Sequence, residues 1–484
     1  MTSNPASTED NRVIQSVTGE SREPYVTEPV TDYREQAIAE VERFPSIQLS
    51  SVIEGNRTAG HQELNSVSIH ELTATLQRAG QYFAEGDVGP SNTGPEEYIR
   101  NVVRVTGLPI TTVRSAVETI RQTFENVESA IRAQTPSTNL RILDDLYYES
   151  PEKTTIGYVP KGHNLGLLAP SNHPAVLSLA LVAYAMKYPL AIRPSDGDPF
   201  TPARIVHALH EAGVPEESAI LLPGDREVGT KILEQSDLAM GFGGEQLQRK
   251  YASSPGVKIH GPGNSKVFVD ADYAEQVETI DRLEEAMMAD GGRGCINMSQ
   301  IVTTGDAETI ANRLAQRIKD VPVRSPLDED SRIPALSDPD QAHRLDQLLT
   351  TNLSSPGAED VTELYDSRPR VIEQDGATFL RPTVVLLDWS EFENGTHDLF
   401  QEFPFQYASV VAVPESEVVT ALSDSLAVTL LSDSRDLERR ALKEPSIEKL
   451  YANGELTCDI DLLEPHQGYI SDFLYKKQAY RPSV

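Results

Sequence analysis

The residues with the strongest nucleophilic chemistry in this chain are its two cysteines, Cys295 and Cys458. Cys295 lies in Gly-Gly-Arg-Gly-Cys-Ile-Asn-Met-Ser-Gln, between an expected helix and an expected apolar strand. Glycines at such a turn let the backbone approach a ligand closely, and the following backbone N–H groups lower a thiol pKa and hold an oxyanion. Arg293 is a nearby cation that would favour the thiolate. A lone cysteine is more often an apolar filler, which is our interpretation of Cys458.

The elements that position Cys295 follow from a regular alternation of short apolar runs and helical patterns. We expect strands at 165–170, 190–194, 219–223, 238–242, 257–260 and 267–269, and helices at 174–186, 199–212, 228–235 and 245–252. This alternation is typical of an α/β fold with a parallel sheet. Ligands bind beyond the carboxyl ends of such strands, so the loops of interest are 170–173, 193–196, 223–225 and 241–244.

Composition narrows the function classes. The chain has 42 Lys+Arg against 74 Asp+Glu, and its first lysine is Lys153. We interpret the net charge of -32 as adaptation to a salt-rich cytoplasm, and the alternative is an ordinary acidic protein. In either case the negative charge argues against a nucleic-acid partner. No apolar run reaches the ~20 residues of a membrane span, and the first residues lack a secretory signal pattern. No Cys/His cluster has metal-ligand spacing, so we expect no metal.

From about residue 157 onward, the order of several short motifs resembles the aldehyde dehydrogenase superfamily. These motifs are Pro170-Ser171-Asn172, Arg193-Pro194-Ser195-Asp196, Ala212-Gly213-Val214-Pro215, Leu222-Pro223-Gly224-Asp225, Phe242-Gly243-Gly244-Glu245, Arg293-Gly294-Cys295, Arg381-Pro382-Thr383-Val384 and Gln401-Glu402-Phe403-Pro404-Phe405. Each match is weak alone, and their order carries the resemblance. Before about residue 140 the chain resembles the family only in being helical.

The resemblance implies a division of the chain. A Rossmann-type NAD(P)-binding domain would take 61–138 and 161–268, and a second α/β domain, 269–464, would carry the nucleophilic cysteine. Residues 139–160 and 465–484 would form oligomerisation strands of a homodimer or homotetramer, pairing within this subunit or with another. Residues 1–60 show little periodicity, and we predict a mobile N-terminal extension.

The resemblance also implies roles for individual residues. Cys295 would attack an aldehyde to give a thiohemiacetal and then, with NAD or NADP as oxidant, a thioester. The Asn172 amide and the Cys295 backbone N–H would form the oxyanion hole. The residues expected to contact the cofactor are Ser171, Arg193, Ser195 and Asp196, with Gly243 and Gly244 at the pyrophosphate and Glu402 at the nicotinamide ribose.

Departures from the family pattern leave the acyl acceptor open. Oxidising members have a Glu before a Gly-Gly-Lys turn, whereas residues 257–264 of this chain, Val-Lys-Ile-His-Gly-Pro-Gly-Asn, contain no carboxylate. His260 would substitute as the base, or coenzyme A rather than water accepts the acyl group. The fatty acyl-CoA reductases also lack that Glu, and this chain resembles them in Asp198-Pro199-Phe200-Thr201 and His260-Gly261-Pro262. Pro404 and Gln406 depart from the pattern around Glu402.

Three further alternatives stay open. Arg193 stands where the family has Lys, and a guanidinium is compatible with a 2′-phosphate, so NAD and NADP both remain. A catalytically silent relative kept for binding is a second class of function. An unrelated dinucleotide-binding enzyme is a third, which the lack of a Gly-x-Gly-x-x-Gly fingerprint disfavours.

Overall fold

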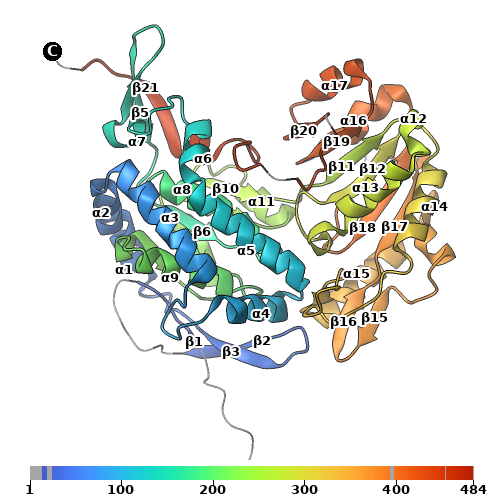
Figure 1. Cartoon of the computed structure of the whole chain (residues 1–484), viewed down its shortest axis with the longest axis horizontal. Helices are drawn as coiled ribbons and strands as arrows, with labels where there is room; N and C mark the ends of the chain where they lie inside the picture. Colours follow the sequence, from blue (N-terminus) through green and yellow to red (C-terminus); the bar gives the residue numbers. More distant parts are fainter. Residues whose placement is uncertain are drawn as a thin grey trace, which may run out of the picture.

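The computed structural model describes residues 13–18, 24, 26–392, 397–452, 454–459 and 461–482. Figure 1 shows two lobes side by side, with the C-terminal strand projecting from the top of the first lobe. Each lobe is built on its own sheet. Within the described residues, no helix combines the length and the apolar character that crossing a bilayer requires.

The first lobe contains the predicted parallel sheet. Its strands are β6 (Leu165–Leu168), β7 (Leu190–Arg193), β8 (Ala219–Leu221), β9 (Leu238–Phe242) and β10 (Val257–His260), in the order β10-β9-β6-β7-β8. All neighbours are parallel. The connecting helices are η2 (Pro174–Leu177), α8 (Ser178–Ala185), α9 (Phe200–Glu211), α10 (Arg226–Gln235) and α11 (Glu245–Tyr251). The strand order reverses between β6 and β9, and such a switch point opens a crevice at the carboxyl ends of the strands.

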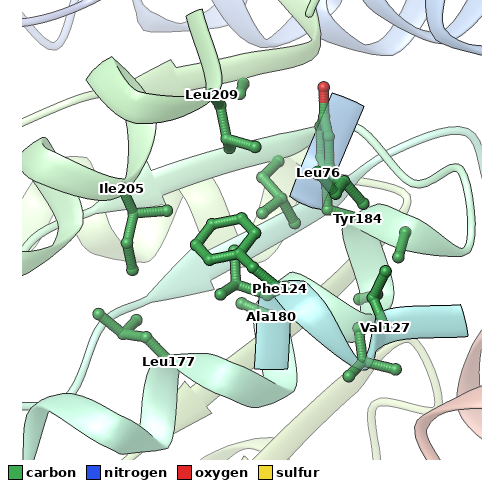
Figure 2. Close-up of a cluster of buried hydrophobic side chains, with 14 of the residues drawn as sticks. Leu76, Phe124, Val127, Leu177, Ala180, Tyr184, Ile205 and Leu209 are labelled. Atoms are coloured by element: carbon green, nitrogen blue, oxygen red, sulfur yellow. The ribbon is translucent and has the colours of Figure 1, made fainter. Parts of the chain in front are cut away.

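The predicted helical region supplies the cover of this sheet. It forms α3 (Ile69–Glu85), α4 (Pro95–Thr106), α5 (Ile110–Glu125) and α6 (Val127–Gln134). Ser68 caps α3 by accepting the Glu71 N–H, which satisfies one free donor of the first turn. Figure 2 shows Phe124 of α5 between α8 and α9, facing Leu177, Ala180 and Leu209. Phe124 and Tyr184 are at most 1% exposed, so this core fixes the helices over the sheet.

The second lobe has a seven-stranded sheet in the order β14-β17-β18-β12-β11-β19-β20. The strands are β11 (Ser265–Val269), β12 (Met298–Thr303), β14 (Ala358–Asp360), β17 (Thr383–Asp388), β18 (Tyr407–Ala412), β19 (Val428–Leu431) and β20 (Leu450–Tyr451). Only β14 is antiparallel to its neighbour. The predicted domain boundary between residues 268 and 269 puts most of β11 in the first domain and is wrong, because β11 pairs with β12 and β19 of the second sheet. An apolar strand pattern does not reveal which sheet a strand joins.

The remaining elements of the second lobe surround this sheet. A small antiparallel sheet joins β13 (Ala335–Leu336), β16 (Ala377–Leu380) and β15 (Val371–Gln374). The helices are α12 (Ala271–Ala274), α13 (Val277–Met288), η4 (Ala289–Gly292), α14 (Ala307–Ile318), α15 (Pro339–Asn352), η5 (Val361–Leu364), η6 (Trp389–Glu391), η7 (Glu415–Glu417), α16 (Val418–Leu422) and α17 (Arg435–Leu442).

The N-terminal segment differs from the predicted mobile extension wherever the structure describes it. β1 (Val13–Ile14), β2 (Thr27–Thr31) and β3 (Ala37–Glu42) form a sheet, followed by α1 (Leu49–Gly55), η1 (Asn56–Gly60) and α2 (His61–Ser66). Val30 and Val41 are buried, and Val17 bridges to Leu221 at the edge of the main sheet. The remainder of 1–60 lies outside the described residues. Short strands with one polar face give little periodicity, which explains the wrong prediction.

The predicted pairing of the C-terminal strand with residues 139–160 is confirmed within one chain. After α7 (Ile142–Asp145), β4 (Tyr147–Glu149) pairs with β5 (Thr155–Pro160), which pairs with β21 (Tyr475–Ala479), the strand after α18 (Ile470–Leu474). Tyr158 and Tyr475 stack with ring centroids 4.6 Å apart. A role in oligomerisation stays a prediction.

Candidate active site

A cavity of about 280 Å³ lies where the two lobes meet, at the end of β6 and β9. Both lobes contribute side chains that the sequence analysis singled out: Ser171, Asn172, Gly243, Gly244 and His260 from the first, Cys295 and Glu402 from the second. These residues are spread over more than 200 positions of sequence. The geometry brings them together at the switch point of the parallel sheet, which is where a ligand crevice is expected.

Asn172 lies beside the backbone of the cysteine segment. Its Nδ2 donates to the carbonyl oxygen of Arg293 at 3.0 Å. A primary amide carries two N–H hydrogens, so one remains for a second acceptor. Asn172 and Cys295 line the same cavity. This arrangement is compatible with the predicted oxyanion hole.

The turn after β10 is packed against the backbone of Cys295. A Cβ on Gly263 would lie 1.7 Å from the Cys295 carbonyl oxygen, so only glycine fits. The same carbonyl accepts the Ser265 hydroxyl at 3.1 Å. Glu402 holds the turn from the other side, accepting from the Gly263 N–H at 2.8 Å and the Asn264 N–H at 3.1 Å. Burial raises the pKa of Glu402. Its predicted contact with a ribose stays a prediction.

The electrostatics of Cys295 correct one expectation. Burial raises the pKa of Cys295 to about 12; the carboxylates of Glu402 and Asp290 add to this, while its own backbone N–H and Lys449 act to lower it. The expected influence of Arg293 is wrong. Its guanidinium donates to the carbonyl oxygens of Thr106 at 2.6 Å and Ala335 at 2.7 Å. Proximity in sequence did not place the Arg293 charge at the thiol, because its long side chain is directed to backbone oxygens of other segments.

His260 is held in one tautomer by a residue from the C-terminal segment. Its Nδ1 lies 2.5 Å from Oε1 of Gln467, and a carbonyl oxygen only accepts, so Nδ1 carries the proton. The Nε2 atom is buried and has no partner among the described residues. Burial, with help from Lys258, lowers the pKa of His260 to about 4. His260 is therefore neutral near pH 7, with its Nε2 lone pair free to accept a proton.

His466 and Gln467, which lie beside His260, were not predicted as site residues from the sequence. The ring of Phe242 stacks on His260 with centroids 5.1 Å apart, and the ring of His466 lies 6.0 Å away. His466 and Gln467 line the same cavity. They come from a loop more than 200 residues further along the chain, next to the C-terminal strand, and no local sequence signal links them to β10.

A second cavity of about 310 Å³ lies at the ends of β7 and β8. Ser195, Asp196 and Gly224 line it, as does Arg43 from the N-terminal segment. Arg193 is not part of its lining: Arg193 Nε donates to the Gly224 carbonyl at 3.0 Å, and Nη2 lies 3.2 Å from the Asp196 carboxylate. Arg43 Nη1 reaches the same carboxylate at 3.3 Å. The sequence analysis missed Arg43 because it expected a mobile segment there.

A third cavity of about 100 Å³ borders Cys295 together with the first one. Its walls are largely apolar, with polar groups at a few points. The apolar lining residues are Ala175, Val176, Leu179, Val182, Ile296, Leu462 and Ile470; the polar ones include Thr119, His173, Asp290, Lys449, Asp461 and Glu464. Cys295 thus lies at the junction of two spaces, one at the sheet switch point and one among apolar side chains.

Comparisons with known proteins agree with this architecture. The model of the aldehyde dehydrogenase family matches residues 17–391. A probable methylmalonate-semialdehyde/malonate-semialdehyde dehydrogenase [acylating] from Caenorhabditis elegans is 26% identical over 243 residues, covering 47% of this chain and 44% of that protein. The malonate-semialdehyde dehydrogenase of Halalkalibacterium halodurans is 24% identical over 282 residues, covering 56% and 54%. The chain therefore spans about half the length of these curated relatives.

Solved structures agree over nearly the whole chain. Aldehyde dehydrogenase 21 from Physcomitrella patens, in complex with the reaction product succinate, has a TM-score of 0.76 at 16% identity, covering 96% of this chain and 97% of that one. A betaine aldehyde dehydrogenase variant from Staphylococcus aureus, in complex with NAD+, has a TM-score of 0.75 at 16% identity, covering 98% of both chains. At this identity the likeness establishes the fold.

Proposed function

Because the chain belongs to the aldehyde dehydrogenase family, we propose that it is an NAD(P)-dependent oxidoreductase that oxidises aldehydes, or forms them, through a thioester on Cys295. The observation that carries this proposal is the position of Cys295 at the junction of two cavities. One is lined by Asn172, Gly243 and Gly244, and the other is largely apolar. A cofactor on one side and an acyl group on the other would both reach the sulfur.

The first and second cavities suit the two ends of a dinucleotide. The space beside Gly244 is open, with no atom within 4 Å of where a Cβ would be, so a ligand can approach the backbone there. Gly243 and Gly244 would lie at the pyrophosphate and Glu402 at the nicotinamide ribose, with Ser171 beside them, and Ser195 and Asp196 would hold the adenosine end. NAD or NADP supplies a hydride acceptor when bound.

The groups of the chain divide the reaction among them. The Cys295 thiol gives its proton to solvent, and its sulfur forms a bond to the carbonyl carbon while the electron pair of the carbonyl bond moves to the carbonyl oxygen. The second N–H of Asn172 and the Cys295 backbone N–H donate to that oxyanion, and such a donor is worth ~10²–10³ in rate. Loss of hydride from this carbon leaves a thioester on Cys295. An acceptor must then take the acyl group from the sulfur.

We propose coenzyme A as that acceptor, with His260 taking the thiol proton on Nε2. Two observations support this: the turn at 257–264 has no carboxylate, and the His260 lone pair is free and unprotonated near neutral pH. The name of the Caenorhabditis elegans relative also describes an acylating enzyme. The alternative is hydrolysis, which the same lone pair supports because it would equally accept a proton from water. Reduction of an acyl-CoA is the reverse direction of the proposed reaction.

The test is turnover of a panel of aldehydes with NAD or NADP, with and without coenzyme A, in high-salt buffer. The readout is absorbance of the reduced nicotinamide, and Cys295→Ser is the control. Turnover only with coenzyme A supports the acyl-transfer branch, and turnover without it supports hydrolysis. Cofactor binding without turnover under any condition would instead favour a catalytically silent relative and contradict the proposal.

We also propose three properties of the protein as a whole. Two cysteines, both free, support a reducing cytoplasmic setting. The outer edge of β21, whose one described pairing is with β5, would extend a sheet across two subunits of a homodimer or homotetramer. The net charge of -32 supports a salt-adapted protein.

A further inference from the structure

A buried lysine lies on the apolar side of the reactive thiol. Lys449 comes just before β20 and lines the cavity of about 100 Å³ that also borders Cys295. Its side chain is 6% exposed, and its nearest acidic group, Glu464 Oε2, is 3.9 Å from Nζ. Among the described residues, no acceptor lies within hydrogen-bond distance of Nζ. A buried ammonium with such incomplete pairing is costly, so a second negative charge nearby would stabilise it.

The Cys295 sulfur is the group that becomes negative in this cavity. Arg293, the cation that the sequence places next to it, is directed to the carbonyls of Thr106 and Ala335. Glu402 and Asp290 both act against a thiolate, and Lys449 acts in its favour. Burial lowers the pKa of Lys449, while Glu464, Cys295 and Asp461 act to keep it charged.

We propose that Lys449 stabilises the thiolate of Cys295, from the acyl side of the sulfur and opposite the cofactor. When the S–H bond breaks, its proton leaves to solvent and the electron pair stays on sulfur. Lys449 keeps its three protons throughout, so the pair changes from one positive charge to a neutral ammonium–thiolate pair. This role rests on the proposed function of Cys295 as the nucleophile. Lys449 is a positioning residue in that function, because it places a positive charge near the sulfur and forms no bond to the substrate.

Other titratable groups also lie around the Cys295 thiol. Besides Lys449, those that line the two cavities beside Cys295 are His173, His260, Asp290, Arg293, Glu402, Tyr407, Asp461, Glu464, His466 and Tyr469. Asp290 lies 3.3 Å from His173 Nε2, and Glu464 also accepts the Tyr451 hydroxyl at 2.9 Å. Lys449 is the one Lys or Arg among the described residues that line the 100 Å³ cavity.

The test measures alkylation of Cys295 by iodoacetamide as a function of pH, in a Cys458→Ser background. Iodoacetamide is neutral, so removing a lysine does not change its attraction to the site. An opposite charge at close range shifts a pKa by ~1–3 units, so Lys449→Met should slow alkylation roughly tenfold at a fixed pH below the midpoint. Lys449→Arg should restore the rate to within about threefold of the parent, because it keeps the charge.

Lys258→Met is the matched control, because Lys258 is also partly buried near the site, its Nζ donates to the Gln467 carbonyl at 2.6 Å, and it is not among the charges that act most strongly on the Cys295 thiol. It should leave the alkylation profile unchanged. An unchanged profile in Lys449→Met, or an equal shift in Lys258→Met, would overturn the proposal. If Lys449→Met loses its near-UV dichroism, Lys449→Gln is measured in its place. An unchanged profile with a raised KM only for carboxylate-bearing aldehydes would make Lys449 a substrate anchor instead.

Alkylation needs no turnover, so the two proposals fail separately. If parental Cys295 is not alkylated while turnover persists in Cys295→Ser, the proposed function is wrong. If parental Cys295 is alkylated and inactivated normally but Lys449→Met behaves like the parent, only the role of Lys449 is wrong.

Discussion

Replacing Asn172 with alanine should slow catalysis while leaving the nucleophile intact. Asn172 donates one N–H of its amide to the Arg293 carbonyl oxygen at 3.0 Å, so its second N–H can donate to the substrate oxygen. In the proposed oxyanion hole the Cys295 backbone N–H is the other donor, so the change would remove one of two. Removal of one such donor costs ~10²–10³ in kcat, or about 2.7–4 kcal/mol of transition-state stabilisation.

The assay is steady-state turnover of one aldehyde with saturating cofactor, measured for parent, Asn172→Ala and Asn172→Asp. Asn172→Asp keeps the shape of the side chain but turns its donor into an acceptor, so it should lose more activity than alanine does. KM for the aldehyde should change little, because the donor acts mainly on the charge that develops in the transition state.

Asn126→Ala is the matched control, since its exposed amide also donates to a backbone carbonyl at 3.0 Å, that of Gln122. It should keep parental activity. Iodoacetamide should alkylate Cys295 in Asn172→Ala at close to the parental rate. A kcat within about threefold of the parent for Asn172→Ala would refute the oxyanion-hole assignment.

Three further predictions concern the core, acid stability and cofactor choice. Phe124→Ala should lower the free energy of unfolding by about 3–5 kcal/mol, because Phe124 is 1% exposed; a loss below about 1 kcal/mol in urea unfolding would contradict this packing. Burial lowers the pKa of His207 to about 4, so its contribution to stability is complete above about pH 6.5 and lost toward pH 4. His207→Gln should therefore flatten the loss of stability in that window, measured by urea unfolding at several pH values, and an unchanged slope would count against it. Asp196→Asn removes the carboxylate that Arg43 and Arg193 share, so the ratio of kcat/KM for NADP over NAD should rise roughly tenfold; a fall in that ratio would be inconsistent with a cofactor phosphate near these guanidiniums.

The sequence predicted the first lobe well because its signals are local. Each strand and helix of the parallel sheet has its own apolar run, and the ends of parallel strands meet at one edge whatever the details of packing. Asn172 and Gly243 could be placed together on that ground before any coordinates. The local pattern around Cys295 was not enough to identify it as a nucleophile. The order of the motifs along the chain identified its segment.

The remaining parts of the site depend on contacts that no local pattern carries. Gln467 fixes the His260 tautomer from more than 200 residues away, and Lys449 lines the same cavity as Cys295 from the loop before β20. The predicted influence of Arg293 on the thiol was wrong, because hydrogen-bond partners set the direction of a long side chain. Here those partners are the carbonyls of Thr106 and Ala335. Arg43 was missed because short edge strands with one polar face resemble an unstructured segment.

The measurement that tests the central claim most directly is mass spectrometry of the protein after incubation with an aldehyde and oxidised cofactor, without coenzyme A. The account predicts that the peptide containing Cys295 gains the mass of the acyl group, and that added coenzyme A removes it. Cys295→Ser should show neither the adduct nor turnover. Turnover that persists in Cys295→Ser, or an adduct on Cys458 with none on Cys295, would contradict the account.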